Sequence, residues 1–185
     1  MSRRPPLEQR NFWLWMVLSI CTFGICGLIY SIFNIIDLNN LAKYPRPKKV
    51  PSPEIDDTLL IIIILLMVFT GIGGIVLVFL KFQRLHEYIK YHPKKQSYQV
   101  PSGLKVLLVN ILAPIIGGII ILIVFVIDIF VLANTGPNQF ALVLPIVGAV
   151  IFGIIMLILV IYNIIVNYRW QEAYNERARM LMGIR

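Results

Sequence analysis

The chain has 185 residues, of which 58% are hydrophobic and only 14% are charged, and its mean hydropathy is +0.81. Soluble globular domains average about 45–50% apolar and about 25% charged residues, so this composition excludes an ordinary water-soluble domain. The formal net charge of +8 does not indicate nucleic acid. The sequence offers neither a basic helix free of the apolar runs nor an aromatic platform for bases, and we expect its lysines and arginines to face anionic lipid headgroups.

Four uncharged, mostly apolar runs dominate the chain. A helix rises about 1.5 Å per residue, so about 20 residues cross the roughly 30 Å hydrocarbon layer of a bilayer. Each run is long enough to do so. The sequence therefore predicts an all-α membrane protein of one integral membrane domain, 1–185, with four transmembrane helices at about 12–36, 59–80, 104–132 and 140–167.

The first run follows Arg3, Arg4 and Arg10, as the apolar core of a signal peptide would. It is far longer than the roughly 7–15 residues of such a core, and no small-x-small site closes it. We therefore expect an uncleaved first helix, with Trp13 and Trp15 at the level of the lipid headgroups.

The second run repeats part of the first. Superposing Gly27 on Gly74 also aligns Gly24 with Gly71, which predicts an internal repeat of the first two helices. Glycines at i and i+3 in a continuous helix let a neighbouring helix approach closely. We expect such packing contacts at six glycines of the apolar runs: Gly24, Gly27, Gly71, Gly74, Gly117 and Gly118.

The same glycines allow a second arrangement, in which Gly24–Gly27 and Gly71–Gly74 are the tips of hairpins that enter the bilayer and return. A turn at mid-membrane leaves backbone donors and acceptors without partners, at several kcal/mol each, unless protein covers it. Continuous spanning helices are therefore the prediction, and hairpins are the alternative.

No disulfide, metal site or cofactor is expected. Cys21 and Cys26 are five residues apart in one predicted helix, where about 100° per residue turns them to different faces. His86 and His92 are six residues apart, with the second beside a proline, and match no metal-ligand spacing.

The second helix should extend beyond the membrane to about residue 91, because Phe82, Leu85 and Ile89 recur at helical spacing before Pro93. The tail, 168–185, is amphipathic and is expected to lie on the lipid surface. Six basic residues of this stem, loop and tail are expected to meet anionic headgroups: Arg84, Lys90, Lys94, Lys95, Arg169 and Arg177.

Asn34, Asp128 and Asn163 are the polar side chains that could lie inside the membrane. An intramembrane carboxylate is a functional candidate by default. Asp128, however, follows Leu104 by 24 residues, or about 36 Å of straight helix, which is past the hydrocarbon layer. An interfacial acid is favoured over a buried proton or cation site, and the two asparagines are either partners for another helix or polar helix ends.

The distribution of lysine and arginine predicts the orientation. With four crossings, the N-terminus, the second loop and the tail share one side and carry 13 of these residues, against four in the first loop and none in the third. Since cytoplasmic loops carry the basic excess, we expect a multi-pass protein of the cell membrane with both termini in the cytoplasm. The basic first loop conflicts with this topology, and the hairpin alternative would remove the conflict.

Three stretches resemble a known family: Arg10-Asn11-Phe12, Thr22-Phe23-Gly24-Ile25-Cys26-Gly27 and Asp37-Leu38-Asn39. They are similar to the signature of a prokaryotic domain-of-unknown-function family of small multi-pass membrane proteins, in which T-x-G-I-Y-G precedes aromatics and a K/D-rich exit. The resemblance covers about residues 8–45, and more loosely the repeat to Tyr91. Cys26 stands where the family favours tyrosine, and no tryptophan follows Gly27. The resemblance implies a membrane location and no established activity.

An enzyme needs acid, base, nucleophile or metal ligands gathered in a shielded site, and here the polar residues are scattered at helix ends. We therefore expect a non-catalytic membrane protein, acting as a scaffold, an accessory subunit or a bilayer-shaping element. Its partners would be the lipid bilayer with its anionic headgroups, and either a second copy or other membrane proteins. A small transporter or channel subunit is the alternative: the glycine- and proline-interrupted runs suit it, but a charge at the midplane is missing.

Overall fold

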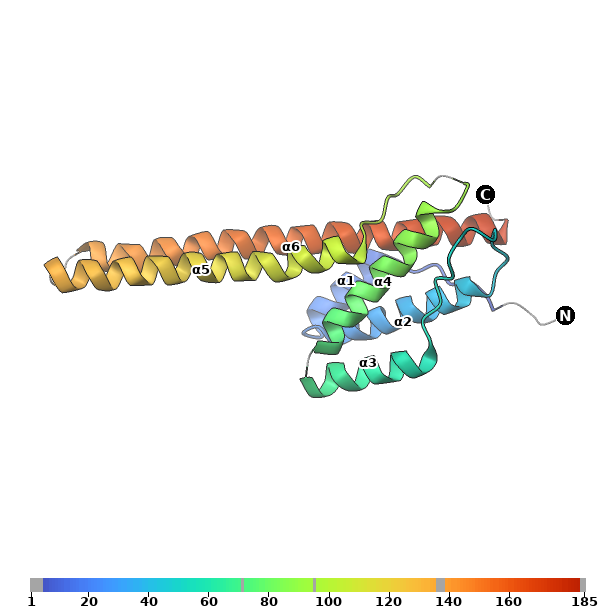
Figure 1. Ribbon diagram of the computed structural model, residues 1–185, viewed down its shortest axis with the longest axis horizontal. Coiled ribbons are helices and arrows are strands. Elements are labelled where there is room, and N and C mark those ends of the chain that lie inside the picture. Colours follow the sequence, from blue (N-terminus) through green and yellow to red (C-terminus); the bar gives the residue numbers. More distant parts are fainter. Residues whose placement is uncertain (1–4, 71, 95, 136–138, 184–185) are drawn as a thin grey trace. The chain divides into compact units, whose positions relative to one another are not determined.

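The protein is described by a computed structural model over residues 5–70, 72–94, 96–135 and 139–183. Every regular element in these ranges is an α-helix, which confirms the all-α prediction (Figure 1). The helices are α1 (Phe12–Cys21), α2 (Ile25–Ala42), α3 (Asp57–Thr70), α4 (Ile72–Lys90), α5 (Gly103–Thr135) and α6 (Gln139–Met182).

The chain divides into two compact units. Unit 1 comprises Met1–Leu107 and Ile165–Arg185, and unit 2 comprises Leu108–Ile164. Unit 1 thus holds α1 to α4, the start of α5 and the C-terminal part of α6, while unit 2 holds the rest of α5 and α6.

Among the described residues, three helices are long and apolar enough to cross a membrane, which makes this a candidate multi-pass membrane protein. They are α2, Gly103–Asn134 of α5 and Val143–Met182 of α6. The apolar stretches Phe12–Cys21 and Asp57–Met67 are shorter. Four continuous spans were expected, and the structure corrects this prediction in the first two runs, because each of them is broken into two helices.

The first run is a helical hairpin instead of one helix over 12–36. Asn11 begins α1, since its side chain accepts hydrogen bonds from the backbone N–H groups of Trp13 at 2.9 Å and Leu14 at 3.3 Å. The helix ends at Cys21 because Phe23 and Gly24 take positive φ angles of 50° and 93°. This left-handed pair reverses the chain, and α2 returns against α1 (Figure 1).

The backbone of this turn is almost fully hydrogen-bonded within itself. Gly24 donates to the Ser19 carbonyl at 2.8 Å and Ile25 donates to the Thr22 carbonyl at 3.2 Å. The Thr22 hydroxyl accepts from the Cys26 N–H at 3.0 Å and donates to the Leu18 carbonyl at 2.7 Å. The penalty for unpaired backbone, which favoured a continuous helix, is therefore largely avoided.

The second run is also a hairpin, in which α3 and α4 pack against each other on either side of residue 71. Thr70 ends α3 as Thr22 ends α1: its hydroxyl donates to the Leu66 carbonyl at 2.7 Å and accepts from the Ile72 N–H at 3.3 Å. Gly73 lies where α4 meets α3, and a Cβ there would overlap the Ile63 carbonyl oxygen and the Met67 amide nitrogen.

The core of unit 1 lies at the open ends of the two hairpins. α2, α4 and the C-terminal part of α6 each bury one face there at helical spacing. The largest fully buried side chains are Trp170, Tyr88, Tyr174, Phe82, Ile35, Leu38, Leu41, Ile55, Leu77, Leu85, Gln171 and Val106.

The tail expected to lie on lipid is part of this core, which is a second correction. α6 is one helix of 44 residues without a boundary near 168. Trp170 and Tyr174 stack with centroids 5.8 Å apart, and the Trp170 indole donates to the Lys81 carbonyl at 3.0 Å. The apolar face of the tail therefore packs on protein.

In unit 2, α5 and α6 contact each other along apolar arms. A Cβ at Gly117 would lie 2.7 Å from the Phe152 ring, and one at Gly148 would lie 3.1 Å from Val124. Asn110 and Asn163 exchange amide hydrogen bonds of 3.2 and 2.9 Å. Outward faces of both arms carry large exposed apolar side chains, as a lipid-facing surface requires.

Candidate functional site

Apolar side chains cover the tips of both hairpins of unit 1. Phe23 is fully exposed, at 100%, and Phe69 is 80% exposed. Ile20, Ile25 and Ile72 surround them with more than half of their surface exposed. Large apolar side chains exposed at the tip of a hairpin favour contact with lipid or with another protein.

Beneath these tips, the open ends of the hairpins hold buried charges and amides. The guanidinium of Arg10 pairs with the carboxylate of Asp37 through two contacts, Nε to Oδ2 at 2.7 Å and Nη2 to Oδ1 at 3.2 Å. Only 2% of the Asp37 side chain is exposed. Arg10 also contacts Glu8 at 2.7 Å and lies over the Phe33 ring, 4.6 Å from its centroid. Removing one partner of such a pair costs about 3–5 kcal/mol, so this ion pair locks the segment before α1 onto α2.

Asn175 and Gln171 extend the polar network onto α6. The Asn175 amide accepts from the Arg10 backbone N–H at 3.3 Å and donates to the Arg10 carbonyl at 3.0 Å. Gln171 donates to Asn175 at 2.9 Å and accepts from the Tyr30 hydroxyl at 2.5 Å. The segment before α1, α2 and α6 are thereby joined at one level; we call Arg10, Asp37, Tyr30, Gln171 and Asn175 the polar base.

Lys81 is a buried lysine beside the polar base. Its Nζ donates to Asn167 Oδ1 at 2.9 Å and lies 4.8 Å from the Trp170 ring centroid, 5.3 Å from that of Tyr30 and 5.4 Å from that of Phe82. Burial lowers the pKa of Lys81 from 10.5 to about 7. The ammonium is therefore held by one amide oxygen and three ring faces.

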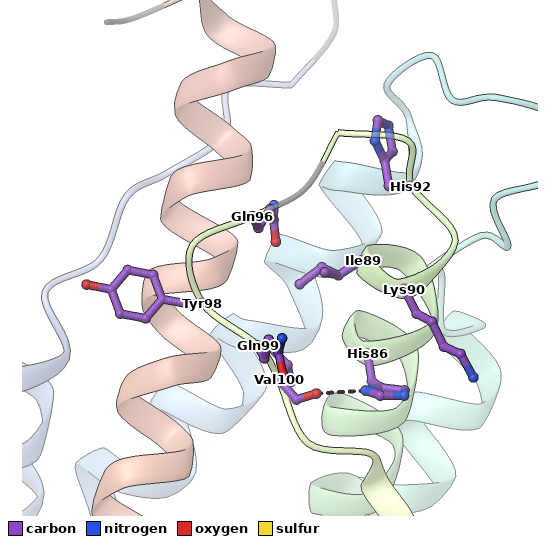
Figure 2. A pocket seen from close by; sticks show the side chains of 8 residues that line it. All are labelled: His86, Ile89, Lys90, His92, Gln96, Tyr98, Gln99 and Val100. Atoms are coloured by element: carbon purple, nitrogen blue, oxygen red, sulfur yellow. Dashed lines mark hydrogen bonds between the residues drawn. The ribbon is translucent and has the colours of Figure 1, made fainter.

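A cavity of about 520 Å³ opens between α4 and the loop that follows it (Figure 2). The His86 ring donates from Nδ1 to the Val100 carbonyl at 2.7 Å, which leaves Nε2 as the acceptor of the neutral ring. Arg177 donates to the Tyr88 hydroxyl at 3.3 Å and contacts Nε2 of His92. The lining residues are His86, Ile89, Lys90, His92, Gln96, Tyr98, Gln99 and Val100.

This cavity suits hydrogen bonding to a small polar molecule more than covalent chemistry. Desolvation, together with the charges of Arg177 and Lys94, lowers the pKa of His92. Across the part of the chain that the structure describes, no three His, Cys, Asp or Glu side chains gather as metal ligands. The free cysteines Cys21 and Cys26 both lie in the first hairpin, away from the lining residues.

The six glycines predicted to pack helices are placed differently from one another. A Cβ at Gly27 would lie 2.6 Å from the Ser19 hydroxyl, and one at Gly117 would meet Phe152. A Cβ at Gly74 would have only Met67 near it, at 3.9 Å, while one at Gly24 or Gly118 would have nothing within 4 Å. Gly71 lies outside the described residues. Gly24 serves the turn rather than a helix contact.

Of the six basic residues predicted to face headgroups, Arg177 is buried in the core of unit 1, because its guanidinium contacts Tyr88 and His92. Its role as a headgroup ligand is corrected accordingly. Lys90, Lys94 and Arg169 are exposed, Arg84 is half-buried, and Lys95 lies outside the described residues.

The three candidate intramembrane polar residues have different surroundings. Asn163 exchanges amide hydrogen bonds with Asn110 of α5, which favours the helix-partner alternative over a polar helix end. Asn34 is fully buried in α2 beside the Tyr30 hydroxyl, and its side-chain oxygen has no hydrogen-bond partner among the described residues. Asp128 is half-buried in α5, and its Oδ1 has no hydrogen-bond partner there either.

The polar base was not predicted from the sequence, although one signal pointed to it. Arg10 precedes Gly24 by 14 residues, and Asp37 follows it by 13. Folding the run at Gly24 therefore brings the two opposite charges together. The partners on α6, Gln171 and Asn175, carry no comparable signal.

No family model, curated protein or solved structure matches this chain. The family resemblance of residues 8–45 therefore stays a prediction.

Proposed function

We propose that the protein is a non-catalytic membrane protein that shapes the bilayer by inserting two helical hairpins into one leaflet. The observation that carries this proposal is the length of the arm before each break. α1 has 10 residues and α3 has 14, or about 15 and 21 Å of helix. Half of the hydrocarbon layer is about 15 Å thick, so each hairpin has the reach of a single leaflet.

The positions of polar residues in α2 and α4 also support insertion of the hairpins into a single leaflet. α2 is long enough to cross, but beyond Tyr30 it buries Asn34 and Asp37 against protein. In α4, Lys81 is buried ten residues beyond the break, and charged residues follow it. The apolar parts near the tips would lie in lipid, and the polar base would lie at the level of the headgroups.

The distribution of basic residues also favours this insertion. With two hairpins, the N-terminus, the loop at 43–56, the loop at 91–102 and the C-terminus all lie on one side. All 17 lysines and arginines then lie on that side or at its membrane surface, and the connection between α5 and α6 has none. The conflict in the first loop disappears, and the positive-inside rule places this side in the cytoplasm.

Shaping follows from unequal insertion. The α5 and α6 arms of unit 2 are long enough for both leaflets, whereas the hairpins of unit 1 add volume to one leaflet only. A wedge in one leaflet expands it relative to the other and bends the bilayer towards that side. No observation in the described residues favours the transporter alternative, since Asn110 and Asn163 of unit 2 hydrogen-bond each other.

Reconstitution into liposomes tests the proposal. We expect the full-length protein to reduce vesicle diameter, or to draw tubules, in proportion to the protein-to-lipid ratio, as measured by electron microscopy and light scattering. The double variant Phe23→Asp/Phe69→Asp puts charges at both tips and should lose this effect while it stays membrane-bound through unit 2. The matched control Phe23→Leu/Phe69→Leu should remodel vesicles like the wild type. Unchanged vesicles with the wild type, or full remodelling by the aspartate variant, would contradict the proposal.

A further inference from the structure

A second cavity, of about 390 Å³, lies between the segment that leads into α1 and one face of α6. Gln9, Arg10, Asn11 and Trp13 line one wall. The other wall consists of Tyr168, Glu172, Asn175 and Arg179, which follow one another at spacings of four, three and four residues and so share a helix face. We call this cavity the α1–α6 groove.

Several polar groups of the groove are already engaged. Arg10 is paired with Asp37 and Glu8, Asn175 holds the backbone of Arg10, and the Asn11 side chain caps α1. These contacts fix the two walls relative to each other, because both hydrogen bonds of the Asn175 side chain are made to the backbone of Arg10. The groove is thus built by the fold before any ligand arrives.

Glu172 and Arg179 remain available. Both are half-exposed, and neither makes an ion pair or a hydrogen bond in the ranges that the structure describes. They stand two helical turns apart, about 10 Å along the axis, with opposite charges. A ligand between them would meet a carboxylate at one end and a guanidinium at the other.

Aromatic rings stand next to the carboxylate end. The rings of Trp13 and Tyr168 have centroids 5.8 Å apart with a 39° tilt, and Phe12 closes the group at 5.4 Å from Trp13. Ring faces beside a carboxylate favour an ammonium group, and an arginine fork favours a phosphate.

We propose that the α1–α6 groove binds a zwitterionic phospholipid headgroup, with its phosphate on Arg179 and its amine between Glu172 and the Trp13–Tyr168 ring pair. The surface of α1 beyond the groove supplies the apolar contact that the acyl chains of a lipid require. Leu14 and Val17 there are more than half exposed. The pair of interfacial aromatics also matches the position of tryptophan and tyrosine at membrane surfaces.

The test measures bound lipid on the purified full-length protein in detergent by native mass spectrometry. We expect phosphatidylethanolamine to bind with one saturable equivalent and more tightly than phosphatidylglycerol, which lacks the amine. Arg179→Gln should weaken both lipids by about tenfold or more. Glu172→Gln should weaken phosphatidylethanolamine alone and so reduce or reverse the preference. Arg46→Gln, an exposed arginine of the loop that follows α2 and outside the groove, is the matched control and should leave the preference for phosphatidylethanolamine unchanged.

Soluble glycerophosphoethanolamine distinguishes the two sources of this headgroup. Competition at concentrations close to those of the lipid would identify a free headgroup as the ligand, whereas weak competition identifies the lipid. Equal binding of the two lipids by the wild type, or an unchanged preference in Glu172→Gln, would overturn the proposal. These outcomes do not depend on vesicle remodelling, so this proposal and the proposed function can fail separately.

Discussion

Lys81 shows how a single side chain can make the stability of unit 1 depend on pH. The nearest groups to its Nζ are an amide oxygen and three aromatic rings, none of which is a carboxylate. A buried ammonium without a counter-ion is costly, and burial lowers its pKa to about 7.

We predict that Lys81→Met stabilises the protein at pH 6 by on the order of 3 kcal/mol and that the gain fades as the pH rises. In the unfolded chain the lysine keeps its proton up to about pH 10.5, whereas in the folded protein it loses it near pH 7. The unfolded state therefore binds more protons between these values, and the wild type gains stability with rising pH in that window. Thermal unfolding in detergent measures the effect.

The control for this prediction is Lys90→Met, which changes an exposed lysine of the same helix. The free energy of unfolding of Lys90→Met should differ little from that of the wild type, and the difference should be the same at every pH. A constant difference for Lys81→Met as well would show that the Lys81 proton does not respond to folding.

Asn34 offers a second prediction at the same scale. Its amide oxygen is buried without a hydrogen-bond partner in the described part of the chain, so Asn34→Leu should stabilise the protein by about 1–3 kcal/mol. Asn39 is the matched control, because its amide accepts from the Ile55 N–H at 2.8 Å and donates to the Ile55 carbonyl at 2.9 Å. Asn39→Leu should lose stability by a similar amount in the same unfolding experiment. A loss with Asn34→Leu would mean that its amide is engaged after all.

At the scale of helices, α4 approaches α3 closely at Gly73 in the second hairpin. A methyl group there would overlap the backbone of α3, whereas one at Gly74 would lie 3.9 Å from the flexible Met67 side chain. We predict that Gly73→Ala lowers the free energy of unfolding by about 1–3 kcal/mol, while Gly74→Ala leaves it equal or slightly raises it. Denaturation followed by circular dichroism compares the two. Equal effects at the two positions would contradict the close packing of α3 and α4.

The α5 and α6 arms of unit 2 allow a similar comparison with adjacent glycines. A Cβ at Gly117 would press on the Phe152 ring at 2.7 Å, and one at Gly118 would have open space. Gly117→Ala should destabilise the pair by about 1 kcal/mol, because the ring must move, and Gly118→Ala should be neutral or favourable through helix propensity. Unfolding in detergent measures both, and a greater loss at Gly118 would place the contact on the other face.

The all-α membrane class could be predicted from the sequence, because the length and hydropathy of an apolar run show whether its helix suits lipid or water. The breaks between α1 and α2 and between α3 and α4 could not be predicted, since a turn at mid-membrane was expected to leave its backbone unpaired. Thr22 and Thr70 supply hydroxyl partners at these breaks, and Gly24 supplies the left-handed conformation. The tail was misplaced for a related reason: periodicity shows that Trp170 and Tyr174 share an apolar face, but not whether lipid or protein covers it.

For the molecule as a whole, the decisive property is the side of the membrane on which each loop lies. The proposed insertion predicts that Ser52→Cys and Ser97→Cys lie on the same side and that Asn134→Cys lies on the opposite side. Labelling intact cells with a membrane-impermeant thiol reagent, with Cys21 and Cys26 replaced, should modify only the cysteine at 134. Continuous spans would instead expose residue 52 together with residue 134, and that result would exclude the hairpins.

The contact between Arg10 and Asn175 also constrains how the chain is made. These residues are separated by 165 positions, so Asn175 is synthesised long after Arg10. Asp37 is available to Arg10 much earlier, only 27 positions later. The first hairpin can therefore form the Arg10–Asp37 ion pair at its open end before α6 is made. The hydrogen bonds between Arg10 and Asn175 of α6 form afterwards. A nascent chain that stalls before residue 175 would leave the backbone N–H and carbonyl of Arg10 without these partners, and we expect quality-control proteases to degrade such a chain faster than the folded protein.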